Sequence, residues 1–281
     1  MQTSDRDATI RQIRRDVFLS AWSAGAGHLA SAYSVVEILY ALYFMDVLRY
    51  RPQEPDWPER DRFVLSKGHA SLAYYSVLSL AGYFGRELLY TFAQPGSRLG
   101  GEPNMLELPG VEATTGSLGH GLSYAAGTAL SQRLDDDGAK TFVLLGDGEC
   151  EEGSTWEAAM IAAKLGLNNL TAILDCNCLQ KLGTVANIAG IDDWPARWKA
   201  FGWDVFEADG HDPDAVADAL KAKPNEAPRI LIAHTVKGKG VSIMENRVDW
   251  HYRLPNPKQL KKFMEQLDIS EEELRACRQH S

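Results

Sequence analysis

Short apolar segments that alternate with helix-length segments are the feature that most constrains the fold of this sequence. Apolar runs predict strands over residues 63–65, 141–145, 170–174, 203–206 and 229–233. Helical spacing or small residues predict helices over residues 9–24, 34–48, 70–81, 117–134, 151–165 and 213–222. We therefore predict an α/β fold, with a mainly parallel sheet and helices on both faces. Ligands of such folds bind outside the carboxyl ends of the strands.

No linker-like stretch divides the 281 residues, and one large domain accommodates this length. We expect that domain over residues 1–255, followed by a charged helical tail over residues 256–281 that is available for packing on a partner. Ser34 and Glu37 have the spacing of a capping box, which predicts that the second helix begins at Ser34.

The composition is that of an ordinary globular protein with an excess of acidic residues. The formal net charge is −9, and 45% of the residues are hydrophobic. We find no clustered basic run that indicates nucleic-acid binding, and no apolar run approaches the roughly 20 residues that span a bilayer. The polar first segment lacks the apolar region of a signal peptide, so we expect a cytoplasmic protein without a membrane partner.

The four cysteines are Cys150, Cys176, Cys178 and Cys277. A disulfide framework is not expected in a cytoplasmic α/β chain. The spacing of Cys176 and Cys178 raises the question of a soft-metal site. Neither a histidine nor a further cysteine pair lies nearby in sequence to complete four ligands, so the sequence disfavours such a site.

A carboxylate between two glycines follows directly on the strand predicted over residues 141–145. The glycines of Gly146-Asp147-Gly148-Glu149 let the backbone approach a ligand closely. Asn177 follows the next predicted strand, and the ends of parallel strands meet at one edge of a sheet. Carboxylate and amide oxygens suit Mg²⁺, which completes its octahedron with phosphate oxygens and water. A backbone carbonyl near Leu179 is the candidate third ligand.

Each of these features alone has an ordinary explanation. The glycine turn fits a plain strand-to-helix turn, and Asn177 fits a loop residue that bonds its own backbone. Their combination across one strand–helix–strand unit is specific. It resembles the thiamine-diphosphate motif, which begins with Gly-Asp-Gly and ends with an asparagine.

Further segments resemble the transketolase family, in the family's order along the chain. They are Gly27-His28, residues 61–70 with His69, residues 110–119, Gly146-Asp147-Gly148 with Glu152-Gly153, and residues 234–240 followed by Trp250-His251. In that family, the counterpart of residues 110–119 is a loop whose backbone N–H groups meet the diphosphate at a helix N-terminus. The resemblance implies the thiamine-diphosphate-binding fold, with thiamine diphosphate and Mg²⁺ as cofactors.

The resemblance also assigns roles to single residues. It implies catalytic roles for His28, His69 and His251, and Mg²⁺ ligation by Asp147, Asn177 and the carbonyl of Leu179. The implied cofactor-binding residues are His69, Gly116, Ser117, Leu118, Gly146, Asp147, Gly148, Glu149, Asn177, Lys237 and His251. Glu152 is expected to couple paired active sites. Taken singly, His28 fits a satisfied loop histidine, Lys237 a solvated charge, and Glu152 an acid favoured by a helix N-terminus.

This chain resembles only the first part of a full-length transketolase. The second domain of that family holds the aminopyrimidine and supplies the glutamate that activates the cofactor. We therefore expect the N-terminal subunit of a split transketolase, active only with a C-terminal transketolase-like subunit, with two copies of each chain. Its expected reaction moves a two-carbon ketol unit from a ketose or ketose phosphate to an aldehyde. Two alternatives stay open: a split carboligase or 2-oxo acid enzyme with an acyl donor such as pyruvate, and a non-catalytic subunit.

Two residues depart from the family pattern. Glu102 replaces the histidine of a Gly-His-Pro segment, and His120 stands where glutamine is usual. An ionised carboxylate only accepts hydrogen bonds, and it repels phosphates. We therefore hypothesise a donor or acceptor outside the usual pentose and hexose phosphates. The alternative is a rebuilt loop that leaves Glu102 facing solvent.

Overall fold

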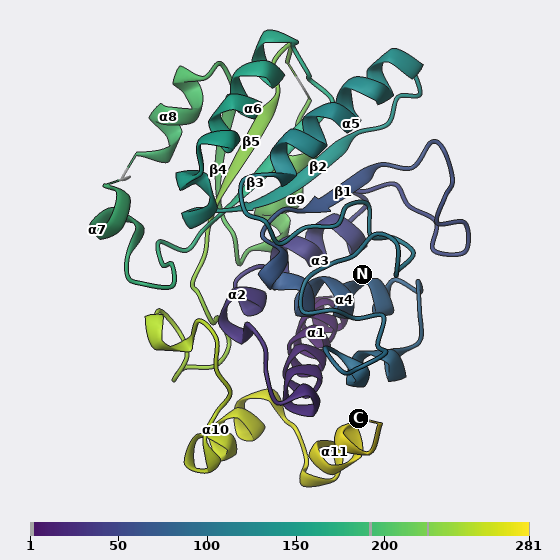
Figure 1. Ribbon diagram of the computed structural model, residues 1–281, viewed down its shortest axis with the longest axis vertical. Helices are drawn as coiled ribbons and strands as arrows, with labels where there is room; N and C mark the ends of the chain where they lie inside the picture. Colours follow the sequence, from purple (N-terminus) through teal and green to yellow (C-terminus); the bar gives the residue numbers. More distant parts are fainter. Residues whose placement is uncertain (1–2, 191–192, 224, 281) are drawn as a thin grey trace.

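One parallel sheet organises the computed structural model, which describes residues 3–190, 193–223 and 225–280 (Figure 1). In these residues five strands pair side by side in the order β1-β2-β3-β5-β4, and every pair is parallel. The strands are β1 (Arg62–Leu65), β2 (Thr141–Gly146), β3 (Leu170–Cys176), β4 (Asp204–Asp209) and β5 (Arg229–His234). The predicted mainly parallel sheet is confirmed, and each predicted strand is present.

Helices cover both faces of the sheet, as predicted. Because side chains alternate along a strand, Phe142 and Leu144 of β2 face one helical layer, and Val143 and Leu145 face the other. The first layer contains α1 (Thr3–Ala24), α2 (Leu29–Tyr33), α3 (Val36–Phe44), α4 (Ser71–Leu80) and α9 (Pro213–Lys221). The second contains α5 (Gly121–Asp135), α6 (Gly153–Lys164) and α8 (Trp194–Ala200). No helix of the described part of the chain is both long and apolar enough to cross a membrane.

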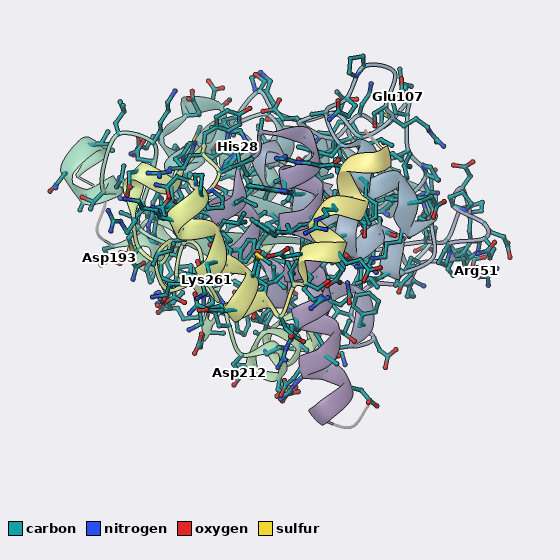
Figure 2. All side chains as sticks on the ribbon, turned by 90° about the horizontal axis from the view of Figure 1, so that it is seen from below. His28, Arg51, Glu107, Asp193, Asp212 and Lys261 are labelled. Atoms are coloured by element: carbon teal, nitrogen blue, oxygen red, sulfur yellow. The ribbon has the colours of Figure 1, made fainter. Side chains whose placement is uncertain are left out.

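The last two helices pack against α1 (Figure 2). Capping boxes at Asn256 and Ser270 begin α10 (Pro257–Leu267) and α11 (Glu271–Ala276). Phe263 of α10 is fully buried, with its ring 5.1 Å from that of Phe18. The tail thus shares its core with the preceding residues, and the predicted boundary at residue 255 stays a prediction.

The remaining elements are short. They are α7 (Val185–Ala189) and the 3-10 turns η1 (Gly68–Ala70), η2 (Arg86–Thr91), η3 (Gly148–Glu151), η4 (Val248–Trp250) and η5 (Cys277–His280). Turns η1 and η3 follow β1 and β2, so they lie at the carboxyl edge of the sheet. This edge is where ligands of parallel sheets bind.

Three predicted helix starts were wrong, and one of them is that of the first helix, which begins at Thr3 rather than at residue 9. No helix begins at Ser34: α2 ends at Tyr33, α3 begins at Val36, and the Ser34 hydroxyl donates to the buried Asp175 carboxylate at 2.6 Å instead of capping a helix. The helix predicted from residue 117 begins at Gly121. Gly116 and Gly119 have φ values of +128° and +84°, which no helix accommodates.

Candidate active site

A cavity of about 290 Å³ opens at the carboxyl edge of the sheet. It is lined by His28, Lys67, His69, Glu102, Gly116, Leu118, Gly146, Asp147, Gly148, Glu149, Asn177, Leu179, Gln180, Lys181, Lys237 and His251. Every residue to which the sequence assigned a site role is among them, except Ser117 and Glu152. Both of these side chains are exposed. The sequence did not single out Lys67, Gln180 and Lys181.

The ends of β2 and β3 bring the three candidate metal ligands together. Gly146 pairs with Asp175 in the sheet, so the turns that follow the two strands lie side by side. The Asp147 carboxylate is only 2% exposed, and it accepts the N–H groups of Gly148 at 2.8 Å and Cys178 at 2.5 Å. The Leu179 N–H donates to the side-chain oxygen of Asn177 at 3.1 Å.

This set of side chains fits a hard cation. Burial, and next the negative charge of Asp175, raises the pKa of Asp147 to about 6. A nearby cation stabilises the ionised form of a carboxylate in such surroundings. The oxygens of Asp147, Asn177 and Leu179 form an all-oxygen donor set of the kind that Mg²⁺ takes. At present the Leu179 carbonyl accepts a hydrogen bond from the ammonium group of Lys237 at 2.8 Å.

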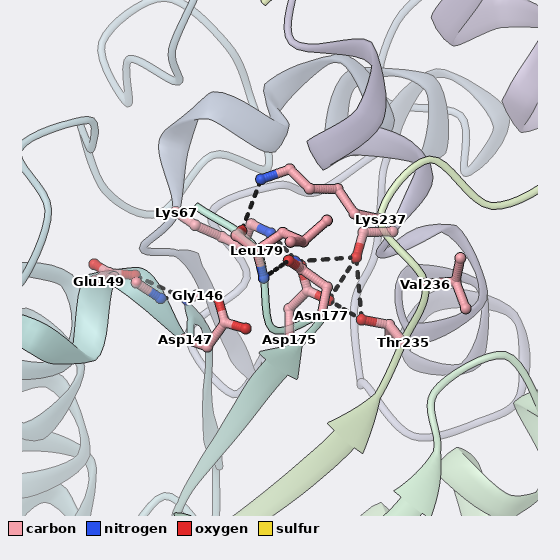
Figure 3. Close-up of polar contacts among 12 residues, drawn as sticks. Lys67, Gly146, Asp147, Glu149, Asp175, Asn177, Leu179, Thr235, Val236 and Lys237 are labelled. Atoms are coloured by element: carbon pink, nitrogen blue, oxygen red, sulfur yellow. Dashed lines mark hydrogen bonds and ion pairs between the residues drawn. The ribbon is translucent and has the colours of Figure 1, made fainter. Parts of the chain in front are cut away.

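Behind these residues lies a buried ion pair that sequence reasoning missed (Figure 3). Lys67 is 1% exposed and Asp175 is fully buried, and their side chains form a short hydrogen-bonded pair. Asp175 also accepts hydrogen bonds from Ser34, Thr235 and the Asn177 amide nitrogen. Burial alone would raise the pKa of Asp175, but Lys67 and the hydroxyl donors outweigh it and lower that pKa.

The network sets the orientation of Asn177. Its amide nitrogen donates to Asp175 at 2.9 Å, so its amide oxygen is on the opposite side of the group, where it accepts the Leu179 N–H. The signal in the sequence was a lysine and an aspartate at the ends of two apolar strands, because such charges are buried only when paired. Their partnership across the sheet is visible only in the fold.

Three histidines from distant parts of the chain form one cluster at the mouth of the cavity. The ring centroids of His28, His69 and His251 lie 5.4 to 5.8 Å apart. Burial, followed by nearby lysine charges, lowers the pKa of His28 to about 4 and that of His251 to about 3. The same causes hold the pKa of His69 well below its usual value. All three rings are therefore neutral near pH 7, and each offers one donor and one acceptor.

These lowered pKa values predict a pH-dependent stability. The unfolded histidines bind protons near pH 6.5, whereas folded His28 does so only near pH 4. The unfolded state therefore holds more protons between these values, and the free energy of unfolding falls as pH decreases through this window. Urea denaturation at several pH values should show a smaller decrease for His28→Asn than for the wild type. Tyr252→Phe, which keeps the ring that packs on His28 at 4.5 Å, is the control. An unchanged decrease in His28→Asn would contradict this assignment.

Glu149 joins the loop before α5 to the sheet. Its carboxylate is buried and accepts hydrogen bonds from the Ser66 hydroxyl and from the N–H groups of Gly119 at 2.9 Å and Gly146 at 3.1 Å. The side chain of Glu149 is thus directed at the protein, and it positions the loop that places Gly116 and Leu118 in the cavity wall.

Lys237 contributes a positive charge to the cavity lining. It is almost fully buried, and its ammonium group lies 3.3 Å from the Nδ1 atom of His251. Burial, and next the charge of Lys67, lowers the pKa of Lys237 to about 8. A buried ammonium of this kind is suited to an anionic ligand group.

Comparison with known proteins identifies the family. Residues 5–273 match the family model described as transketolase, thiamine diphosphate binding domain. The chain is 40% identical to an apulose-4-phosphate transketolase subunit of Phocaeicola vulgatus, over 98% of both chains. It is 41% identical to a 6-deoxy-6-sulfo-D-fructose transketolase subunit of Clostridium sp., over 81% of this chain and 83% of that one. The crystal structure of transketolase from Campylobacter jejuni matches with a TM-score of 0.84 and 31% identity, over 97% of this chain but 46% of that one. This chain therefore belongs to the family of transketolase thiamine-diphosphate-binding domains.

Proposed function

We propose that this chain is the N-terminal subunit of a two-chain transketolase, a transferase that is active only with its partner. The strongest support is the share of each relative's chain that this chain covers. The chain spans nearly all of the Phocaeicola vulgatus relative, which is itself named as one subunit of a transketolase, but less than half of the Campylobacter jejuni transketolase chain. The partner would supply the aminopyrimidine-binding domain and the activating glutamate, in an assembly with two copies of each chain.

The cavity is the proposed site for thiamine diphosphate and Mg²⁺. Asp147, Asn177 and the Leu179 carbonyl would hold the cation, because they form its all-oxygen donor set. The glycine-rich loops would face the diphosphate with backbone N–H groups, and Lys237 would add a positive charge. The proposed cofactor contacts are His69, Gly116, Ser117, Leu118, Gly146, Gly148, Glu149, Lys237 and His251. When bound, thiamine diphosphate supplies the carbon nucleophile that carries the ketol unit.

The neutral histidines are the proposed catalytic residues. His28, His69 and His251 lie close enough together to contact one small polyhydroxylated substrate. Each neutral ring would donate a hydrogen bond to one hydroxyl group and accept a proton from another at its free nitrogen. Glu152 is exposed at the start of α6, where a second chain could reach it for the proposed coupling of paired sites.

A cytoplasmic location is part of this proposal. All four cysteines are free thiols, which the reducing cytoplasm maintains. The alternative of a non-catalytic subunit is disfavoured because the candidate cation ligands and the three histidines line one cavity.

A donor screen of the co-purified pair tests the reaction. We expect ketol transfer from ketoses or ketose phosphates to an aldehyde, and no turnover by this chain alone because the activating glutamate lies on the partner. Turnover would be followed by loss of the aldehyde acceptor. Activity with pyruvate but with no ketose would favour the 2-oxo acid alternative, and substantial activity of the isolated chain would overturn the two-chain proposal.

Glu102 is the proposed determinant of substrate choice. It is exposed, it lines the cavity, and its carboxylate lies 1.9 Å from where a Cβ atom on Gly116 would be. The carboxylate can only accept hydrogen bonds when ionised. It therefore favours a substrate that presents hydroxyl or cationic groups. Two of the relatives are named as transketolase subunits for apulose-4-phosphate and for 6-deoxy-6-sulfo-D-fructose.

Replacing Glu102 with histidine tests this role. In the assembled enzyme we expect Glu102→His to raise kcat/KM for common ketose phosphates about tenfold and to lower it for the native donor, in the range of one altered hydrogen bond to a charged group. Glu107→His is the matched control, because Glu107 is an exposed glutamate of the same segment outside this cavity. If the two variants have the same donor profile, Glu102 has no part in substrate choice.

A further inference from the structure

The geometry at the end of β3 places two thiols on one side of the chain. Cys176 is the last residue of β3, and its thiol lies within 4.8 Å of the Cys178 thiol. Cys178 then adopts a left-handed conformation with φ of +61°. That conformation costs roughly 1 to 2 kcal/mol for a residue with a side chain.

The Asp147 carboxylate completes this group of atoms. One ligand atom from each of Cys176, Cys178 and Asp147 lies within 4.8 Å of the others. Asp147 is held there by the Cys178 N–H, which donates to its carboxylate at 2.5 Å. The sequence had disfavoured a metal site at these cysteines because no further ligand lies nearby in the chain. The fold brings in Asp147, 31 positions away from Cys178.

Asp147 and the two thiols line different cavities. One is the candidate active site, whose lining includes Asp147 but neither thiol. The other is a cavity of about 500 Å³ that is lined by Cys176, Cys178, Trp194, Glu207 and His234, among others. Cys178 is exposed, so an ion in solution can reach the thiols without passing through the active site.

The two sides of Asp147 offer different chemistry. On the active-site side the donors are oxygens, which suit Mg²⁺. On the thiol side two sulfurs accompany one oxygen, and such a set suits Zn²⁺ and softer divalent ions, with water as the fourth ligand. In a tetrahedral zinc site, neighbouring ligand atoms lie about 3.5 to 3.8 Å apart. Because the three atoms lie within 4.8 Å of one another, they would have to approach by at most about 1.3 Å to reach these separations.

We propose that Cys176, Cys178 and Asp147 form a binding site for a soft divalent cation such as Zn²⁺, and that this cation competes with the cofactor's cation for Asp147. Binding releases the two thiol protons to solvent and involves no change of oxidation state. The competition rests on the proposed Mg²⁺ site, whereas the soft-cation site itself does not. An excess of soft cation would therefore prevent cofactor loading while leaving the fold intact.

Cadmium titration of the purified chain tests the site without cofactor or partner. We expect one Cd²⁺ per chain, with ultraviolet thiolate-to-cadmium absorption, and at least about a tenfold weaker affinity in Cys178→Ser. Cys277→Ser is the control, because Cys277 is a free thiol in the C-terminal helical region. Absence of the thiolate absorption in the wild type, or equal affinity in wild type and Cys178→Ser, would overturn the site.

The shared ligand is tested in the assembled enzyme. With thiamine diphosphate and Mg²⁺ present, added Zn²⁺ should lower turnover, a chelator should restore it, and Cys178→Ser should resist the inhibition. Additional Mg²⁺ should raise the Zn²⁺ concentration required. If Cd²⁺ binds the thiols but Zn²⁺ leaves the turnover and the Mg²⁺ affinity unchanged, the competition at Asp147 is overturned.

Discussion

Replacing Asp147 with alanine is expected to weaken Mg²⁺-dependent binding of thiamine diphosphate by more than about 100-fold, since loss of outer-sphere partners alone costs 10- to 100-fold. Asp147 is the only carboxylate among the proposed cation ligands, so its removal leaves two neutral oxygens. Calorimetric titration of the assembled enzyme with cofactor and Mg²⁺ measures the effect. Asp209→Ala is the control, because Asp209 is exposed at the end of β4.

The fold of Asp147→Ala should persist. Burial raises the pKa of Asp147 to about 6, above its value in the unfolded chain. The unfolded state therefore loses its proton first, and the charged carboxylate opposes folding at pH 7. Asp147→Ala removes this unfavourable charge, and the resulting gain in stability offsets the loss of two hydrogen bonds from backbone N–H groups. Equal cofactor affinity in variant and wild type would remove Asp147 from the cation site, whereas an unfolded variant would show that its main role is structural.

Lys67→Met should lower the free energy of unfolding by about 3 to 5 kcal/mol, because it leaves Asp175 charged and buried without a cation. Urea denaturation of the purified chain measures this loss. The double variant Lys67→Met/Asp175→Asn should recover part of it, since no unpaired charge remains. If the single and double variants are equally stable, the ion pair contributes little.

The same variants separate stability from function. Asp175 also fixes the Asn177 amide, so Lys67→Met/Asp175→Asn should weaken Mg²⁺ binding relative to Lys67→Met even where the protein stays folded. Metal affinity measured at low temperature, where both variants are folded, is the relevant readout. A purely packing role for the pair would leave that affinity at the wild-type value.

The sequence predicted those parts of the molecule that local pattern governs. Apolar runs placed the strands, and a glycine-flanked aspartate after one strand with an asparagine after the next placed the edge that carries the cavity. Local pattern misled where a distant group competes for the same atom. Ser34 and Glu37 have capping-box spacing, but the Ser34 hydroxyl bonds Asp175, which lies 141 positions away.

Groups of residues that come together from separate segments of the chain could not be predicted from the sequence either. The pairing of Lys67 with Asp175 depends on the order of strands in the sheet, which spacing along the chain does not reveal. The position of Asp147 beside Cys176 and Cys178 has the same origin. The roles of the site residues all stay predictions, and among them only Ser117 and Glu152 lie outside the cavity lining.

The contacts around Asp175 have a kinetic consequence. Lys67 and Asp175 are separated by 108 positions, and Ser34 and Asp175 by 141. Contacts of such separation form slowly, because a long loop must close before they stabilise anything. Until β1 and β3 are joined through β2, Asp175 stays hydrated and the Asn177 amide has no fixed direction. A partly unfolded chain therefore carries the residues of the proposed cation site without their arrangement, so cofactor loading at that site would depend on the completion of folding.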